Sequence, residues 1–218
     1  MSGPSLIVVS GVPGAGKTTL AHTVARGVGC PAVCRDEIRE GMHHAGTADP
    51  TMRRTYDAFF DTLGVLLRAG VSVVAEAAFA DRLWRPVLSP LAGLATIRVL
   101  RCVADPAVAR ERVVRRLDDP VRAAHGDRDM PARPVAWTPI SLAVPTLEVD
   151  TTDGYSPGLP AIVAFAAARS FSSTGSPPGP CPLRRFTALP RFARSAVNRS
   201  AVTLVRSRAR SPPASERT

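Results

Sequence analysis

The segment Gly11–Thr18 combines the residue types and the spacing that indicate chemistry most clearly. It reads Gly-Val-Pro-Gly-Ala-Gly-Lys-Thr and matches the pattern G-x-x-x-x-G-K-[S/T] in full. A glycine-rich turn lets backbone N–H groups face a phosphate, and the helix that follows adds the positive end of its dipole. We expect Lys17 to reach phosphate oxygens as a point charge and the Thr18 hydroxyl to bind Mg²⁺. The predicted nucleotide-binding residues are Gly11, Val12, Pro13, Gly14, Ala15, Gly16, Lys17, Thr18 and Thr19.

Asp36 and Arg39 are the next candidates, because they follow an expected short strand at residues 32–35. A carboxylate there would lie at the same edge of a parallel sheet as the glycine-rich segment, and it can accept the proton of a hydroxyl group. Arg39 follows one helical turn later and can hold an anionic part of the molecule that carries this hydroxyl. A charged run of this kind is also typical of a solvated helix start. The residues leave both interpretations open.

Glu76 ends an apolar run at residues 71–75 that we expect to be a buried strand. At the carboxyl end of a strand it can hold Mg²⁺ through water or position an attacking group. The alternative is a polar residue that simply leaves the sheet, but residues 77–79 remain apolar and favour the first interpretation. The sequence therefore predicts Thr18 and Glu76 as the metal site.

Arg112, Arg115 and Arg116 stand at positions i, i+3 and i+4 of an expected helix. One helix face can then present several guanidinium groups, which in phosphoryl transfer neutralise charge on the moving γ-phosphoryl group. An exposed basic helix face is the competing interpretation. The sequence does not say which arginine would act.

Strands that alternate with helices are expected to position these residues. Apolar, β-branched runs predict strands at residues 6–9, 32–35, 71–75, 96–103 and 146–149. Helical spacing predicts helices over 17–28, 52–69, from 105 onward through the arginines, and 156–169. This alternation is typical of an α/β fold with a parallel five-stranded sheet between two helical layers. With the glycine-rich motif directly after the first strand, we expect a P-loop NTPase fold.

The last 48 residues differ from the rest of the chain in composition. The net charge of the whole chain is +10, and most of it comes from nine arginines after residue 170, which stand among serines and prolines. No core can be built from such a segment, so we expect a P-loop domain at 1–170 and a basic tail at 171–218. The tail is either an arm that grips nucleic acid or an acidic partner through salt-sensitive contacts, or a disordered extension.

The apolar runs and the cysteines indicate where in the cell the protein is expected and whether its thiols are reduced. No apolar stretch is long enough for a membrane span, and the N-terminus lacks a secretory pattern, so we expect a cytoplasmic protein. The four cysteines, Cys30, Cys34, Cys102 and Cys181, match no common zinc spacing and are expected to be reduced thiols. Cys30 and Cys34 could form a redox or metal pair, but packing at a strand start is the favoured interpretation.

In this order, the glycine-rich loop, the Arg35-Asp36-x-x-Arg39 segment, Glu76 and the arginine helix resemble a family of small P-loop kinases. That family includes polynucleotide 5′-hydroxyl kinases, zeta toxins and chloramphenicol phosphotransferases. The resemblance covers residues 5–168 and implies a parallel sheet, a mobile lid bearing arginines, ATP as donor and Mg²⁺. It implies phosphate and metal roles for Lys17 and Thr18, a general base in Asp36, an acceptor contact in Arg39, and a lid arginine among Arg112, Arg115 and Arg116.

The polynucleotide kinases typically have Asp where this chain has Glu76, so the acceptor could be a small molecule instead of a nucleic-acid end. Two other classes remain as alternatives. One is a switch that hydrolyses ATP and signals through the basic tail, and the other is a nucleic-acid-binding protein with a nucleotide-bound core. The acceptor and the oligomeric state are not predicted.

Overall fold

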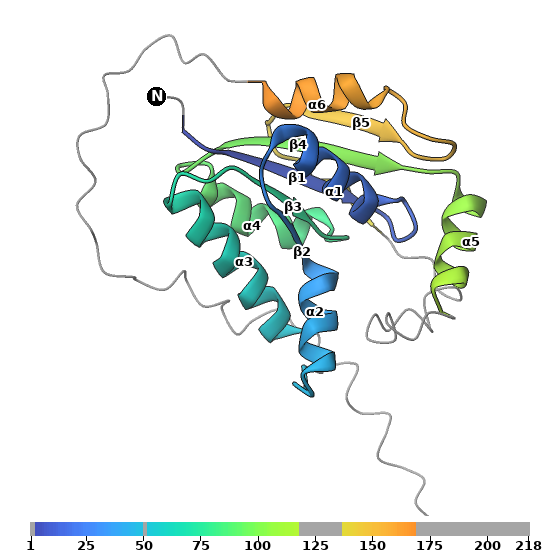
Figure 1. Ribbon diagram of the computed structural model, residues 1–218, viewed down its shortest axis with the longest axis horizontal. Helices are drawn as coiled ribbons and strands as arrows, with labels where there is room; N and C mark the ends of the chain where they lie inside the picture. The colour runs from blue at the N-terminus through green and yellow to red at the C-terminus, as the bar shows by residue number, and fades with distance from the viewer. Residues whose placement is uncertain (1–2, 50–51, 118–136, 169–218) are drawn as a thin grey trace, which may run out of the picture. The chain divides into compact units, whose positions relative to one another are not determined.

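The computed structural model describes residues 3–49, 52–117 and 137–168. Within these ranges a five-stranded parallel sheet has the order β2–β3–β1–β4–β5 (Figure 1). The strands are β1 (Ser5–Gly11), β2 (Ala32–Cys34), β3 (Val73–Glu76), β4 (Thr96–Val103) and β5 (Thr146–Asp150). The predicted α/β fold with five parallel strands is therefore confirmed.

Strand β1 occupies the centre of the sheet and brings the glycine-rich loop between its neighbours. Val9 pairs with Glu76 on one side, and Gly11 pairs with Cys102 on the other. Cys34 pairs with Glu76 in turn, so the carboxyl ends of β1, β2 and β3 lie side by side. The residues that follow these ends can act on one bound molecule.

Helices cover both faces of the sheet. Helices α1 (Lys17–Val28) and α6 (Leu159–Ala167) pack on one face, and α3 (Arg53–Arg68) and α4 (Asp81–Leu91) pack on the other (Figure 1). β1 packs against both helical layers, because Ile7 and Val9 face α1 while Leu6 and Val8 face α3 and α4. Its near-continuous apolar sequence follows from burial on two sides.

The layer under α3 and α4 has an aromatic centre. Phe59, Phe79 and Trp84 pack edge to face or tilted, with ring centroids 5.3 to 5.9 Å apart. All three are buried, and such aromatic pairs add about 0.5–1.5 kcal/mol each beyond the area they bury.

Helix α5 (Pro106–Leu117) begins as the sequence predicts. The Asp105 carboxylate accepts hydrogen bonds from the backbone N–H groups of Ala107 (2.8 Å) and Val108 (3.2 Å), and Pro106 takes the first helical position. Figure 1 shows α5 beyond the carboxyl ends of β4 and β5. The arginines of this helix are therefore positioned at the functional edge of the sheet.

Several boundaries differ from the prediction. Helix α2 (Arg35–His44) starts directly after β2, so Arg35 belongs to a helix and not to a strand. β3 begins at Val73, because Gly70 with φ 77° ends the preceding helix and the exposed Val71 precedes the sheet. Helix α4 was not predicted, since Pro86 and Pro90 inside it interrupt the helical pattern. α6 begins only at Leu159, after Gly158 as its N-cap.

The chain divides into two units, Met1–Pro177 and Pro178–Thr218. The predicted tail at 171–218 lies outside the described residues, as does the segment 118–136. None of the helices in the described ranges combines the length and the apolar character needed to cross a membrane.

Candidate active site

The glycine-rich loop joins β1 to α1 in a conformation that its glycines make possible. Gly14 has φ 82°, and a Cβ atom there would lie 2.1 Å from the backbone oxygen of Ala109 in α5. Only glycine allows this close approach of α5 to the loop. Gly16 caps α1 in the left-handed conformation, without a side-chain cap and without an acidic residue in the first turn. Within the described residues, the first turn of α1 therefore has neither a side-chain cap nor an acidic side chain of its own, which suits an anion site.

Lys17 lies in the first turn of α1 and is buried, with 7% of its surface exposed. Its Nζ donates a hydrogen bond to the Val12 carbonyl oxygen at 2.8 Å, so the ammonium group lies across the loop. Burial lowers the pKa of Lys17, and the negative charges of Glu76 and Asp36 act against this effect. A phosphate would add the negative charge that this buried cation needs.

Thr18 and Glu76 come together as predicted. The Thr18 hydroxyl donates to Glu76 Oε2 at 3.2 Å, and Glu76 is 1% exposed. Burial raises the pKa of Glu76, while Lys17 and the Thr18 hydroxyl lower it. Together with the phosphate oxygens of a bound nucleotide, this carboxylate and hydroxyl would form the all-oxygen set that Mg²⁺ prefers, and a cation would offset the cost of burying the carboxylate. These residues fit Mg²⁺.

Asp36 lies in the first turn of α2, close enough to act electrostatically on both Lys17 and Glu76. Its Oδ1 forms an ion pair with Arg35 Nη1 at 2.8 Å, and the Arg35 guanidinium lies over the Phe79 ring at 5.6 Å from the centroid. The aromatic core therefore orients Arg35, and Arg35 orients the Asp36 carboxylate. Sequence reasoning did not assign this role to Arg35.

Arg39 is half-buried on α2, and its charge acts on Asp49. Asp49 accepts hydrogen bonds from the N–H (2.8 Å) and the hydroxyl (2.6 Å) of Thr55, in the first turn of α3. Burial raises the pKa of Asp49, but these hydrogen bonds outweigh it and the pKa is lowered overall. The predicted acceptor arginine thus lies near the start of α3, on the same helix as Asp36.

The three arginines of α5 have different surroundings. Arg112 Nη2 donates to the carbonyl oxygens of Thr151 (2.8 Å) and Thr152 (3.0 Å), and its Nη1 donates to the Gly14 carbonyl oxygen at 3.5 Å, so Arg112 joins the segment after β5 to the glycine-rich loop. Arg115 is 75% exposed and pairs with Glu111 at 2.6 Å. Arg116 is half-buried, and its charge acts on Lys17. Arg112 thus contacts the loop itself, whereas Arg116 acts on Lys17 through its charge.

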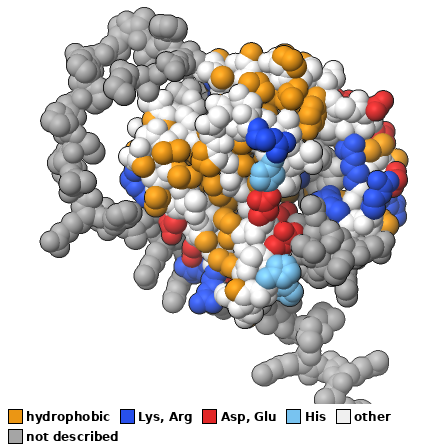
Figure 2. Space-filling view, in the orientation of Figure 1, with side chains coloured by type: hydrophobic (Ala, Val, Ile, Leu, Met, Phe, Trp, Pro, Cys, Tyr) orange, Lys and Arg blue, Asp and Glu red, His pale blue; other side chains and the backbone are white. Residues whose placement is uncertain are grey.

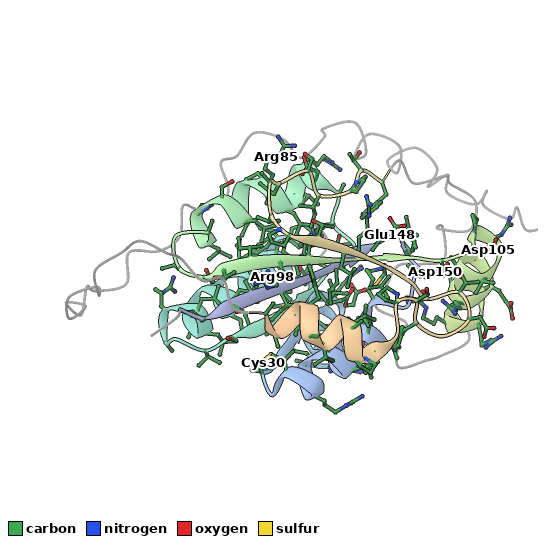
Figure 3. The ribbon with its side chains drawn as sticks, turned by 90° about the horizontal axis from the view of Figure 1, so that it is seen from above. Cys30, Arg85, Arg98, Asp105, Glu148 and Asp150 are labelled. Atoms are coloured by element: carbon green, nitrogen blue, oxygen red, sulfur yellow. The ribbon has the colours of Figure 1, made fainter. Side chains whose placement is uncertain are left out.

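Thr151 supports the loop from the end of β5, a role that sequence reasoning missed. It is buried, and its hydroxyl lies 3.1 Å from both the Ala15 and the Val103 carbonyl oxygens. The adjacent Thr152 N–H donates to Asp150 Oδ1 at 2.7 Å in an Asx-type turn. Figure 3 shows Asp150 at the end of β5, beside α5. A threonine after a strand carries no motif that could have revealed this contact.

The loop, the buried lysine and the parallel sheet together define the P-loop NTPase fold. A family profile described as an AAA domain matches residues 6–130, which is more than half of the chain. The chain belongs to this family. The comparison with curated proteins found no match.

Three solved structures are similar to the chain. A candidate kinase from Chloroflexus aurantiacus J-10-fl is 29% identical with a TM-score of 0.60, over 76% of this chain and 94% of that one. A gluconokinase from Sinorhizobium meliloti 1021 is 19% identical with a TM-score of 0.48, over 77% and 94%. An APS kinase from Mycobacterium tuberculosis, solved with AMPPNP and APS, is 17% identical with a TM-score of 0.44, over 68% and 90%. The family match and the first structure bear out the resemblance to small P-loop kinases.

Proposed function

We propose that this protein is an ATP-dependent kinase that transfers the γ-phosphoryl group to a hydroxyl group of a small molecule. The observation that carries the proposal is the position of Asp36. Its carboxylate acts electrostatically on both Lys17 and Glu76, which supports a role as proton acceptor beside the proposed phosphate and metal site. An ATP-driven switch has no need for a carboxylate aligned by a neighbouring arginine at this place. The similarity to a candidate kinase supports the same class.

The residues divide the work of phosphoryl transfer among them. Lys17 and the N-terminus of α1 bind the β- and γ-phosphates, and Thr18 and Glu76 would hold Mg²⁺. Bound there, Mg²⁺ would neutralise charge on the phosphate oxygens. Asp36 accepts the proton of the acceptor hydroxyl. At the same time the hydroxyl oxygen forms a bond to the γ-phosphorus, and the bond between the γ-phosphorus and the β-phosphate oxygen breaks. Arg116 offsets charge on the moving group.

Arg39 is proposed to bind the acceptor. It lies one turn after Asp36 on α2, on the side of the sheet where α3 begins. An arginine there can hold an anionic or polyhydroxylated acceptor so that one hydroxyl reaches Asp36. A 5′-hydroxyl nucleic-acid end is the alternative acceptor, since its phosphates would suit the same arginine.

An ATP-hydrolysing switch is the second candidate function, and the basic composition after residue 170 is the observation that favours it. The two functions differ in their response to acceptors. We expect ADP release to rise by at least tenfold with one member of a panel of sugars, nucleosides, aminoglycosides and 5′-hydroxyl oligonucleotides. Slow ADP release that no member of the panel changes would favour the switch.

A further inference from the structure

His22, Cys34 and Glu37 come from three successive elements and meet at one point outside the P-loop. His22 lies on α1, Cys34 ends β2 and Glu37 lies in the first turn of α2. His22 Nε2 is 2.6 Å from Glu37 Oε1 and 3.7 Å from Cys34 Sγ. All three potential ligand atoms lie within 4.8 Å of one another. The role proposed above for the P-loop edge uses none of these residues.

The contacts around His22 Nε2 suggest more than a simple ion pair. A ring nitrogen has one proton or one lone pair, so it can make one good hydrogen bond at a time. Here a carboxylate oxygen and a sulfur atom both converge on it. A cation between the three atoms would use the lone pair of each. Nitrogen, sulfur and carboxylate oxygen are also the donors that zinc prefers.

One of the ligand-atom distances matches a zinc site, and a small shift of exposed side chains brings another into range. Metal bonds of about 2.0 to 2.3 Å in a tetrahedron place ligand atoms about 3.3 to 3.6 Å apart. The nitrogen–sulfur distance of 3.7 Å already fits, whereas the nitrogen–oxygen distance of 2.6 Å must widen. The side chains of His22 and Glu37 are 40% and 47% exposed, so they are free to make this small adjustment. Their exposure also leaves room for water as a fourth ligand.

The local charge favours a cation. Burial raises the pKa of the Cys34 thiol, and the neighbouring carboxylates of Glu76 and Glu37 raise it further. A nucleophilic or redox-active thiol needs positive surroundings, which this position does not offer. Figure 2 shows histidine and acidic side chains adjoining along the face that α1 and α2 share. A divalent cation would provide the positive charge that is missing.

We propose that His22, Cys34 and Glu37 form a binding site for a divalent cation with affinity for thiolate, with Zn²⁺ as the best fit. The ion would join α1 to α2, the two helices that carry Lys17 and Asp36. This site is distinct from the oxygen-lined Mg²⁺ site at Thr18 and Glu76. It does not depend on the proposed kinase activity, because binding can be measured without nucleotide.

The test is a calorimetric titration of the full chain with Zn²⁺, without nucleotide and with excess Mg²⁺ to occupy oxygen-only sites. We expect one Zn²⁺ per chain that Cys34→Ser weakens by about 100-fold or more, since even losing the partner of a metal ligand costs about 10- to 100-fold. Cys30→Ser and His43→Ala are matched controls, because they remove a thiol and an imidazole outside the cluster, and they should leave this binding unchanged.

Co²⁺ gives a second readout, because coordination by a thiolate produces a charge-transfer absorption that nitrogen and oxygen ligands do not. We expect this absorption in the wild type and its loss in Cys34→Ser. If Cys34→Ser fails to fold, Glu37→Gln changes an exposed side chain and should still weaken Zn²⁺ binding by at least tenfold. Binding that neither variant weakens, or weakening by Cys30→Ser equal to that by Cys34→Ser, would overturn the proposal.

Discussion

The arginines of α5 show how much a role depends on the atoms next to a side chain. Arg112 and Arg116 are separated by one helical turn, yet the first binds backbone carbonyl groups and the second acts on Lys17. Arg115 turns to Glu111 and solvent. An exposed ion pair of this kind contributes little to stability. The three residues therefore give a direct comparison within one helix.

We predict that Arg116→Ala lowers the rate of phosphoryl transfer by about 10²-fold or more, because arginines that neutralise the moving phosphoryl group contribute about 10³- to 10⁵-fold. Arg115→Ala is the matched control and should change the rate less than threefold. The measurement is the turnover number with the best acceptor at saturating ATP. Equal losses in the two variants would show that α5 acts only through its overall charge.

For single residues, the sequence predicted the P-loop and the proximity of Thr18 to Glu76. Both predictions rest on local signals, a complete motif and the end of a strand. The sequence could not distinguish Arg112, Arg115 and Arg116, since their spacing puts them on one face and only tertiary contacts separate them. The roles of Arg35 and Thr151 were missed for the same reason. Each depends on a partner far away in the sequence.

At the scale of elements, α4 anchors the chain segment that follows residue 136. The Asp81 N–H donates to the Thr138 carbonyl oxygen at 2.9 Å, and Asp81 Oδ1 accepts from the Ser141 N–H at 2.8 Å. Arg85 Nη2 is 2.5 Å from Asp81 Oδ2. The hydrogen bonds from Ser141 and Arg85 hold the pKa of Asp81 below its usual range. This carboxylate thus joins a helix to the segment that leads into β5.

The lowered pKa of Asp81 makes its contribution to stability larger at neutral pH than in acid. The ionised form is favoured in the folded state, so the stabilisation is present above the unfolded pKa of about 4 and is lost as the pH falls through the folded value. We predict that Asp81→Asn lowers the free energy of unfolding by about 1–2 kcal/mol at pH 7. Urea unfolding at pH 7 and pH 3 should show this difference shrinking in acid. A difference that is the same at both pH values would contradict the account of Asp81.

Helices and strands were predicted correctly where the spacing of apolar residues and the residues at the ends of the element agreed. The strands β1 and β4 and the helices α1, α3 and α5 have such patterns, and their predicted positions hold. α4 was missed because two prolines conceal a helix whose Trp84 and Leu88 are buried. The packing of these side chains against the sheet outweighs the local cost of the prolines.

At the scale of the whole molecule, the sheet order could not be read from the sequence. β1 pairs with β3 and β4, although β2 follows it in the chain. The site was still predictable in outline, because all parallel strands bring their carboxyl ends to one edge whatever their order. The convergence of His22, Cys34 and Glu37 was not predictable, since it needs the placement of α2 beside α1. The basic tail at 171–218 lies outside the described residues and stays a prediction.

The central claim is that the γ-phosphoryl group passes to an acceptor hydroxyl whose proton Asp36 takes. The most direct measurement follows that group by mass spectrometry of the acceptor, with ATP affinity measured by calorimetry on the same proteins. We predict that wild type adds one phosphoryl group, that Lys17→Ala adds none, and that Asp36→Asn slows transfer by about 10²- to 10⁴-fold with ATP affinity unchanged. ADP formation without a phosphorylated acceptor, or an Asp36→Asn variant that loses ATP affinity as much as transfer rate, would contradict the claim.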